Sequence, residues 1–236
     1  MSIISRLFWK SIPKPERKLL LSLLDEPNRQ VADKILNQKH SFPIGFDENE
    51  CIFIHIPKVA GISIAQGLGF HSAHTWHLPL KYYEATEPDK YENYFKFGLV
   101  RNPWDRLFSA YQFLQKGGIS EKDSSLTHLV QRYPNFDSFV SKWLSKEAAR
   151  SVIHLTPMHH FFENQQGMIA ADFIGRFENI EQDYNQIREK LGIGDPLPHL
   201  NPSSKTQYTH QYSTKMIDKV AKVYERDISE FNYDFD

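Results

Sequence analysis

Short apolar runs, each followed by a helical pattern, organise most of the chain. Mostly apolar residues cover 51–56, 95–100 and 172–177, and each run has the length of a buried strand. A turn and then an amphipathic segment follow each run. Strand–loop–helix units in succession indicate a parallel sheet with helices on both faces. The sequence therefore predicts an α/β fold built on an open parallel sheet.

The clearest helical pattern comes directly after the second run. Asn102 is a good N-cap, and Pro103 suits a first helical turn. The apolar stripe of this helix comprises Trp104, Leu107, Phe108, Tyr111 and Leu114. Further helices are expected from Ile64 onward, up to Leu191 after the third run, and over 214–224.

The N-terminal segment is predicted to form a helical appendage to this domain. Its leucines at helical spacing are Leu19, Leu20, Leu23 and Leu24. Pro27 breaks that pattern, and a second stripe begins at Val31. Residues 41–45 have the composition of a linker. We therefore expect an appendage over 1–45 and a main domain over 46–236.

Composition and charge narrow the classes of protein. The 236 residues are 40% hydrophobic and 24% charged, which is typical of globular proteins. The formal net charge is −1, so no overall positive field marks a nucleic-acid binder, and an anion site must be built locally. The single cysteine, Cys51, excludes a disulfide framework or a cysteine zinc cluster within the chain.

No apolar stretch has the length of a membrane span or of a usual signal peptide. Together with the single cysteine, this predicts a soluble, cytoplasmic protein. A peripheral position at the inner face of the membrane is the alternative location. The sequence says nothing about oligomeric state.

A turn suited to phosphate binding follows the first predicted strand, in the order His55-Ile56-Pro57-Lys58-Val59-Ala60-Gly61-Ile62-Ser63. The start of a helix favours an anion through its free N–H groups and its dipole. Gly61 would let the backbone approach a phosphate, while Lys58 adds a charge and Ser63 a hydroxyl. The lysine precedes the glycine, unlike in G-x-x-x-x-G-K-[ST], which argues against a nucleotide hydrolase. An ordinary turn with a solvated lysine is the alternative.

A second candidate anion site lies after the second predicted strand. Arg101 comes at the strand's C-terminal end, where ligands gather in open parallel sheets. Ser109 lies about two helical turns further on, so both side chains could reach one phosphate. Asp105 and Arg106 are expected to form surface or structural pairs. The alternative is a capping arginine and a core-facing serine.

Together, the two segments resemble the carbohydrate sulfotransferases that use 3′-phosphoadenosine 5′-phosphosulfate (PAPS). They are most similar to bacterial members of the branch containing heparan 2-O- and chondroitin-type sulfotransferases. The resemblance implies a fold like that of the P-loop NTPases. It also implies that Arg101 and Ser109 hold the 3′-phosphate. By the same resemblance the 5′-phosphosulfate loop comprises Lys58, Val59, Ala60, Gly61, Ile62 and Ser63.

The resemblance covers about residues 50–235. The matches at 173–180, 197–201 and 224–233 are less specific than the two paired motifs. Ile62 departs from the pattern, because many relatives carry threonine or serine there. If that hydroxyl normally touches a phosphate oxygen, only the backbone N–H of Ile62 remains to do so. Lys205 either reaches the nucleotide from a covering loop or is a solvated loop lysine, and both interpretations stay open.

Catalysis needs a cation at the leaving oxygen and a base at the acceptor hydroxyl. Lys58 is the candidate for neutralising charge on the bridging oxygen, and no metal is expected. Histidine has a suitable pKa for the base. The resemblance points to the region of His77, which we rank before His74 and His71. A zinc site in this cluster is disfavoured, because no cysteine or acidic ligand lies at suitable spacing.

The resemblance thus implies sulfuryl transfer from PAPS to a hydroxyl of an acceptor, expected to be a carbohydrate, with adenosine 3′,5′-bisphosphate as product. Two other classes stay open. One is a nucleotide or small-metabolite kinase of similar fold, and the other is a non-catalytic nucleotide-binding module. The identity of the acceptor cannot be read from the sequence.

Overall fold

A computed structural model describes residues 8–37, 42–70, 77–119, 121–197 and 208–235. Within these ranges three parallel strands form one sheet in the order β1 (Cys51–Ile54), β2 (Phe95–Val100) and β3 (Phe173–Arg176). Ile54 pairs with Gly98, and Val100 pairs with Arg176. The loops that leave the three strands therefore begin at the same edge of the sheet. This confirms the predicted open parallel sheet.

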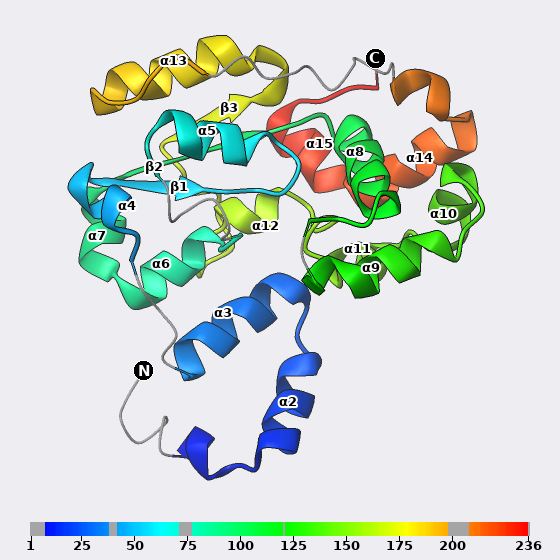
Figure 1. The fold of residues 1–236 in the computed structure, drawn as a ribbon, viewed down its shortest axis with the longest axis horizontal. Coiled ribbons are helices and arrows are strands. Elements are labelled where there is room, and N and C mark those ends of the chain that lie inside the picture. The colour runs from blue at the N-terminus through cyan, green and yellow to red at the C-terminus, as the bar shows by residue number, and fades with distance from the viewer. Residues whose placement is uncertain (1–7, 38–41, 71–76, 120, 198–207, 236) are drawn as a thin grey trace.

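Helices cover both faces of the sheet (Figure 1). The helices α5 and α13 lie on one side, and α6, α7 and α12 lie on the other. In chain order the helices are α2 (Lys14–Ser22), α3 (Glu26–Leu36), α4 (Ile44–Glu48), α5 (Gly61–Gly67), α6 (Leu80–Thr86), α7 (Pro88–Asn93), α8 (Pro103–Gln115), α9 (Glu121–Gln131), α10 (Phe136–Lys142), α11 (Lys146–Arg150), α12 (His159–Phe162), α13 (Ile180–Leu191), α14 (Thr214–Val223) and α15 (Glu225–Phe231). Two 3₁₀ turns cover Phe177–Asn179 and Tyr208–Gln211.

The sheet sits in the larger of two apolar cores. All four residues of β1 are buried, as a strand covered on both faces requires. Gly98 in β2 is needed for close packing, because a Cβ there would lie 2.8 Å from the Phe162 ring of α12 and 2.8 Å from the Ile54 carbonyl oxygen. The opposite face is covered by α13, whose Tyr184 and Ile187 are buried in the same core.

A second core lies among α8, α10 and α14. Asn102 caps α8 as predicted, since its side chain accepts a hydrogen bond of 3.1 Å from Trp104 N. All five residues of the predicted stripe are buried, namely Trp104, Leu107, Phe108, Tyr111 and Leu114. Burial of that stripe fixes α8 and thereby the loop that precedes it.

The structure corrects several predicted bounds of helices and of the linker. Helix α5 begins at Gly61 and not at Ile64, because the left-handed conformation of Ala60 ends the turn and the next residue is already helical. The predicted linker 41–45 ends in helix α4, which buries Phe46. The chain also forms a further helix, α15, after α14, and the sequence analysis missed it.

The N-terminal appendage contains helices α2 and α3, where the two leucine-rich and aliphatic stripes predict them, but Pro27 lies in the first turn of α3. Asp25 caps α3 and also pairs with Arg150. Lys81 Nζ of α6 donates a 2.5 Å hydrogen bond to Asn28 Oδ1 of α3. The division into 1–45 and 46–236 stays a prediction. Within the described ranges, none of the helices has the length and apolar character needed to cross a bilayer.

Asp227 of α15 holds the start of α12 in place through hydrogen bonds. This carboxylate is fully buried and accepts hydrogen bonds from Met158 N at 2.7 Å and His159 N at 2.9 Å. A third contact joins it to His159 Nδ1 at 2.6 Å. Because the two backbone N–H groups are buried, they depend on this one side chain for their partners.

Replacing Asp227 with alanine should destabilise the fold by at least about 3 kcal/mol, because two buried N–H groups and a buried imidazole lose their acceptor. Denaturant unfolding measures the loss. Asp218→Ala, at an exposed position of α14, is the matched control and should change stability by less than about 0.5 kcal/mol. Equal effects of the two changes would contradict the anchoring role.

Candidate functional site

The turn between β1 and α5 has an unusual backbone. Lys58 has φ 72° and Ala60 has φ 63°, both in the left-handed region, whereas Val59 between them does not. Non-glycine residues rarely adopt this conformation, and it is maintained only where surrounding structure requires it. Alternation of this kind turns successive N–H groups toward one side and forms a concave anion site. The turn leads directly into the start of α5. Ser63 N there already donates to the Ala60 carbonyl oxygen at 3.0 Å, so the first two N–H groups, those of Gly61 and Ile62, are the candidates for contact with an anion.

Glycine is needed at position 61 for a reason other than the approach of a phosphate. A Cβ at this position would lie 2.0 Å from Cδ2 and 2.3 Å from Nε2 of His55. The imidazole of His55 is buried and stacks on Phe53 with ring centroids 5.6 Å apart. Gly61 therefore lets α5 start against the His55 ring, which the sequence analysis did not anticipate.

Arg101 links the loops that follow all three strands. Its Nη1 donates to the Lys58 carbonyl oxygen at 3.1 Å, and its Nε donates to Asp105 Oδ2 at 2.8 Å. The guanidinium carbon lies 4.0 Å from the centre of the Phe177 ring, directly after β3. Since Arg101 is 8% exposed, these contacts hold the cation in place at the C-terminal edge of the sheet.

Ser109 lies half-buried on α8, one turn beyond Asp105 and on the same side of the helix. Asp105 contacts Arg101 itself and so orients the predicted phosphate-binding arginine. Arg106 has the structural role that was expected. It is buried and donates to the Pro57 carbonyl at 3.0 Å and to the Thr156 carbonyl at 3.0 Å, which ties α8 to the Lys58 loop.

Lys58 lies in a locally positive environment in a chain of net charge −1. Its ammonium group rests 4.1 Å from the centre of the Phe113 ring, a cation–π contact. Burial, followed by the charges of Arg101 and Arg106, lowers the pKa of Lys58 to about 8. Cations from two neighbouring loops thus lie together where the sequence predicts an anion site.

His77 lies beside this loop with a defined tautomer. Its Nδ1 is 2.8 Å from the His55 carbonyl oxygen, which can only accept, so Nδ1 carries the proton. The lone pair of the neutral ring is therefore on Nε2. Burial lowers the pKa of His77, against a smaller opposing effect of the His55 hydrogen bond. A neutral imidazole with a free Nε2 is what a general base requires.

Two residues missed by the sequence analysis complete this group. The ring of His154 lies 6.3 Å from that of His77 and 5.2 Å from that of Phe113. Its Nε2 is 3.7 Å from Asp123 Oδ1, beyond hydrogen-bonding distance. Burial, and then nearby His77, lowers the pKa of His154 to about 4, so His154 is neutral at neutral pH and this contact is not an ion pair there. We define Lys58, His77, Phe113, Asp123 and His154 as the histidine–lysine cluster.

No local sequence signal marks His154 or Asp123, because both reach the cluster through long-range packing. His74, His71 and Lys205 lie outside the described residues, so their predicted roles stay predictions. Ile62, which departs from the pattern of the resemblance, is 43% exposed on α5. The structure thus brings the Lys58 loop, Arg101 and His77 to one edge of the sheet.

Comparison with known proteins assigns the family. Residues 44–234 match the profile of a family described as "Sulfotransferase family". The chain belongs to this sulfotransferase family. The predicted resemblance is confirmed at this level.

The individual relatives share low sequence identity with this chain. Carbohydrate sulfotransferase 11 of Mus musculus is 23% identical over 234 residues, which cover 79% of this chain and 65% of the relative. Carbohydrate sulfotransferase 14 of Homo sapiens is 31% identical over 111 residues, 42% of this chain and 29% of the relative. An uncharacterized protein of Archaeoglobus fulgidus is 25% identical over 120 residues, 50% of this chain and 85% of the relative. The chain thus spans less than two thirds of the length of the first two relatives. No solved structure matches.

Gly61→Ala should destabilise the sulfotransferase by about 1–3 kcal/mol, because the new methyl group collides with the buried His55 ring. The double variant His55→Ala/Gly61→Ala removes the collision, so its cost should fall below the sum of the two single changes. A double-mutant cycle by denaturant unfolding measures this coupling. Strictly additive effects would show that the collision does not govern the position.

Proposed function

We propose that this sulfotransferase moves the sulfuryl group of PAPS to a hydroxyl group of a carbohydrate. The observation that carries the proposal is the contact between Arg101 and the Lys58 carbonyl in a chain whose residues 44–234 match the family. That contact joins two candidate anion sites at one edge of the sheet. A donor with a phosphate at each end of its nucleoside suits two such neighbouring sites.

The Lys58 loop is the proposed site for the 5′-phosphosulfate. Left-handed Lys58 and Ala60 and the first two N–H groups of α5 suit an anion with several acceptor oxygens. The ammonium group of Lys58 neutralises the charge that develops on the bridging oxygen when the sulfur–oxygen bond breaks. Arg101 and Ser109 are the proposed ligands of the 3′-phosphate, with Asp105 holding the arginine in position.

His77 is the proposed general base. The acceptor hydroxyl gives its proton to Nε2 while its oxygen bonds to sulfur, and the electron pair of the breaking bond leaves with the 5′-phosphate. The hydrogen bond from Nδ1 to the His55 carbonyl supports this role, because it keeps Nε2 unprotonated before the reaction. His154 is neutral beside His77 and adds no competing positive charge near neutral pH.

The carbohydrate class of acceptor rests on the names of the mouse and human relatives. The cytoplasmic location and transfer without a metal stay predictions. Radiolabelled sulfuryl transfer from PAPS to a panel of bacterial surface glycans, in excess chelator, tests the activity. Labelled glycan is the expected product. Phosphoryl transfer from ATP that requires Mg²⁺, with no transfer from PAPS, would overturn the proposal in favour of a kinase.

Arg101→Ala should weaken binding of adenosine 3′,5′-bisphosphate by about 10- to 150-fold, the effect of losing a charge-assisted hydrogen bond. Ser109→Ala should cause a smaller loss without disturbing the Lys58 loop. Calorimetry measures both affinities, and Arg132→Ala, at an exposed position, is the control. Wild-type affinity in folded Arg101→Ala would refute the 3′-phosphate assignment.

His77→Ala should lower kcat by about 100- to 10,000-fold while bisphosphate affinity stays near that of the wild type. The wild-type kcat/KM should fall on the acid side below the ordinary histidine pKa, as His77 becomes protonated. It should also fall above about pH 8, as Lys58 loses its charge. His128→Ala on the exposed face of α9 is the matched control. Normal kcat in His77→Ala, with loss in His74→Ala, would move the base to His74.

A further inference from the structure

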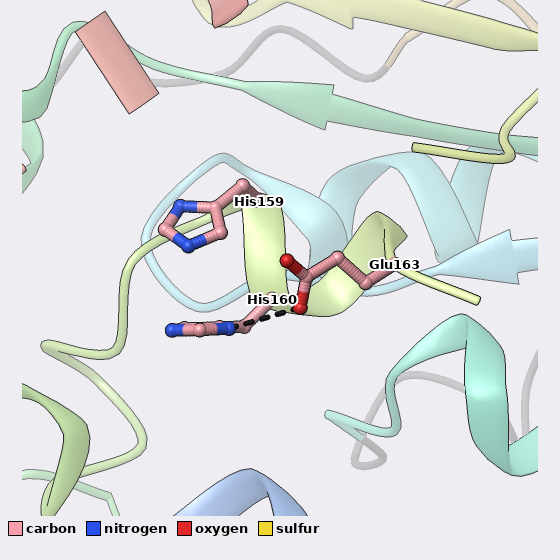
Figure 2. Close-up of side chains that lie close together, drawn as sticks. All are labelled: His159, His160 and Glu163. Carbon is pink, nitrogen blue, oxygen red and sulfur yellow. Dashed lines mark hydrogen bonds and ion pairs between the residues drawn. The ribbon is translucent and has the colours of Figure 1, made fainter. Parts of the chain in front are cut away.

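A second cluster of histidine and carboxylate groups lies on the turn formed by α12. His159, His160 and the helix-ending residue Glu163 each offer a ligand atom, and these atoms lie within 4.8 Å of one another. Figure 2 shows the two imidazoles and the carboxylate gathered on one side of this turn. None of the three belongs to the proposed donor site or to the histidine–lysine cluster.

His159 is already oriented as a metal-binding histidine would be. Its Nδ1 is 2.6 Å from Asp227 Oδ1, and Asp227 is itself held by two backbone N–H groups. A carboxylate that accepts from Nδ1 leaves the Nε2 lone pair for a ligand. Such carboxylate–histidine pairs fix the tautomer and ring orientation of metal ligands.

His160 and Glu163 have the spacing of two ligands of one ion. His160 Nδ1 lies 3.1 Å from Glu163 Oε2. Two ligand atoms bound tetrahedrally to zinc at its usual bond lengths are separated by about 3.4 Å. A cation could therefore take the place of the proton between these two atoms with only small side-chain movements, and the neutral imidazole would then carry its proton on Nε2.

The charges around Glu163 leave one of its oxygens for an ion. Arg226 Nη1 contacts Oε1 at 2.5 Å, whereas Oε2 faces His160. The arginine competes with a bound cation for the negative charge of Glu163 and should weaken its affinity. The His160 side chain is 17% exposed, so the site is open to solvent on this side.

We propose that His159, His160 and Glu163 form a zinc-binding site that joins α12 to α15 through Asp227 and Arg226. Two imidazoles and one carboxylate suit Zn²⁺ and related transition metals, whereas Mg²⁺ and Ca²⁺ prefer sites made of oxygen ligands. Three protein ligands leave a fourth position for water. The site is independent of the proposed sulfuryl transfer, which is expected to continue in excess chelator.

Zinc titration of the full chain, after removal of metals with chelator, tests the proposal. We expect one Zn²⁺ per chain with a dissociation constant below about 100 μM, no competition from millimolar Mg²⁺, and weaker binding at lower pH. Zinc should also raise the melting temperature. Absence of saturable binding in this range, or displacement by Mg²⁺, would overturn the site.

Variants locate the ion within the chain. His160→Ala and Glu163→Gln should each weaken zinc binding at least about 10-fold and abolish the thermal shift, whereas His128→Ala should not. Arg226→Ala should tighten binding, because it removes the competing cation. A purely structural role for the cluster predicts no such gain. Equal zinc affinity in His160→Ala and His128→Ala would overturn the assignment, even if the chain binds zinc through other histidines.

Discussion

The arrangement of the candidate donor site depends on the contacts of one guanidinium group. Arg101 leaves the end of β2, donates to the carbonyl of Lys58 after β1, and lies over the ring of Phe177 after β3. Parallel pairing of the three strands brings these loops to one edge, and Arg101 then sets their relative positions. Asp105, one helical turn along, prevents the guanidinium from turning away. Without this cation the left-handed turn at Lys58 would lose a contact that keeps its strained backbone in place.

Much of the fold could be predicted because it follows from local rules. The three strands lie in mostly apolar runs, and α8 carries both its cap and its apolar stripe in one short segment. The start of α5 was predicted three residues late, because sequence alone does not show that Ala60 is left-handed. Helix α15 was missed because its position depends on Asp227, whose partners lie more than 60 residues earlier in the chain.

The candidate site was predicted only in part for the same reason. Lys58, Arg101 and His77 lie in segments with recognisable motifs, and the structure places these segments together. His154 and Asp123 approach the cluster only through packing of distant helices, so no spacing rule marks them. Gly61 was predicted for access to a phosphate, but the structure adds a steric reason, the buried ring of His55.

The shared use of Lys58 has a thermodynamic consequence. Its carbonyl oxygen accepts the hydrogen bond from Arg101, while its ammonium group, which lies over the Phe113 ring, is the proposed partner of the 5′-phosphosulfate. A ligand that orders Arg101 therefore also orders the Lys58 loop. A second phosphate that binds to the ordered loop then loses less conformational entropy of the protein than it would alone. Fragments carrying a single phosphate should then bind with free energies whose sum falls short of that of the whole nucleotide. Under the proposed assignment, Lys58 couples binding at the two anion subsites, so that the donor is recognised as one unit and not as two separate phosphates.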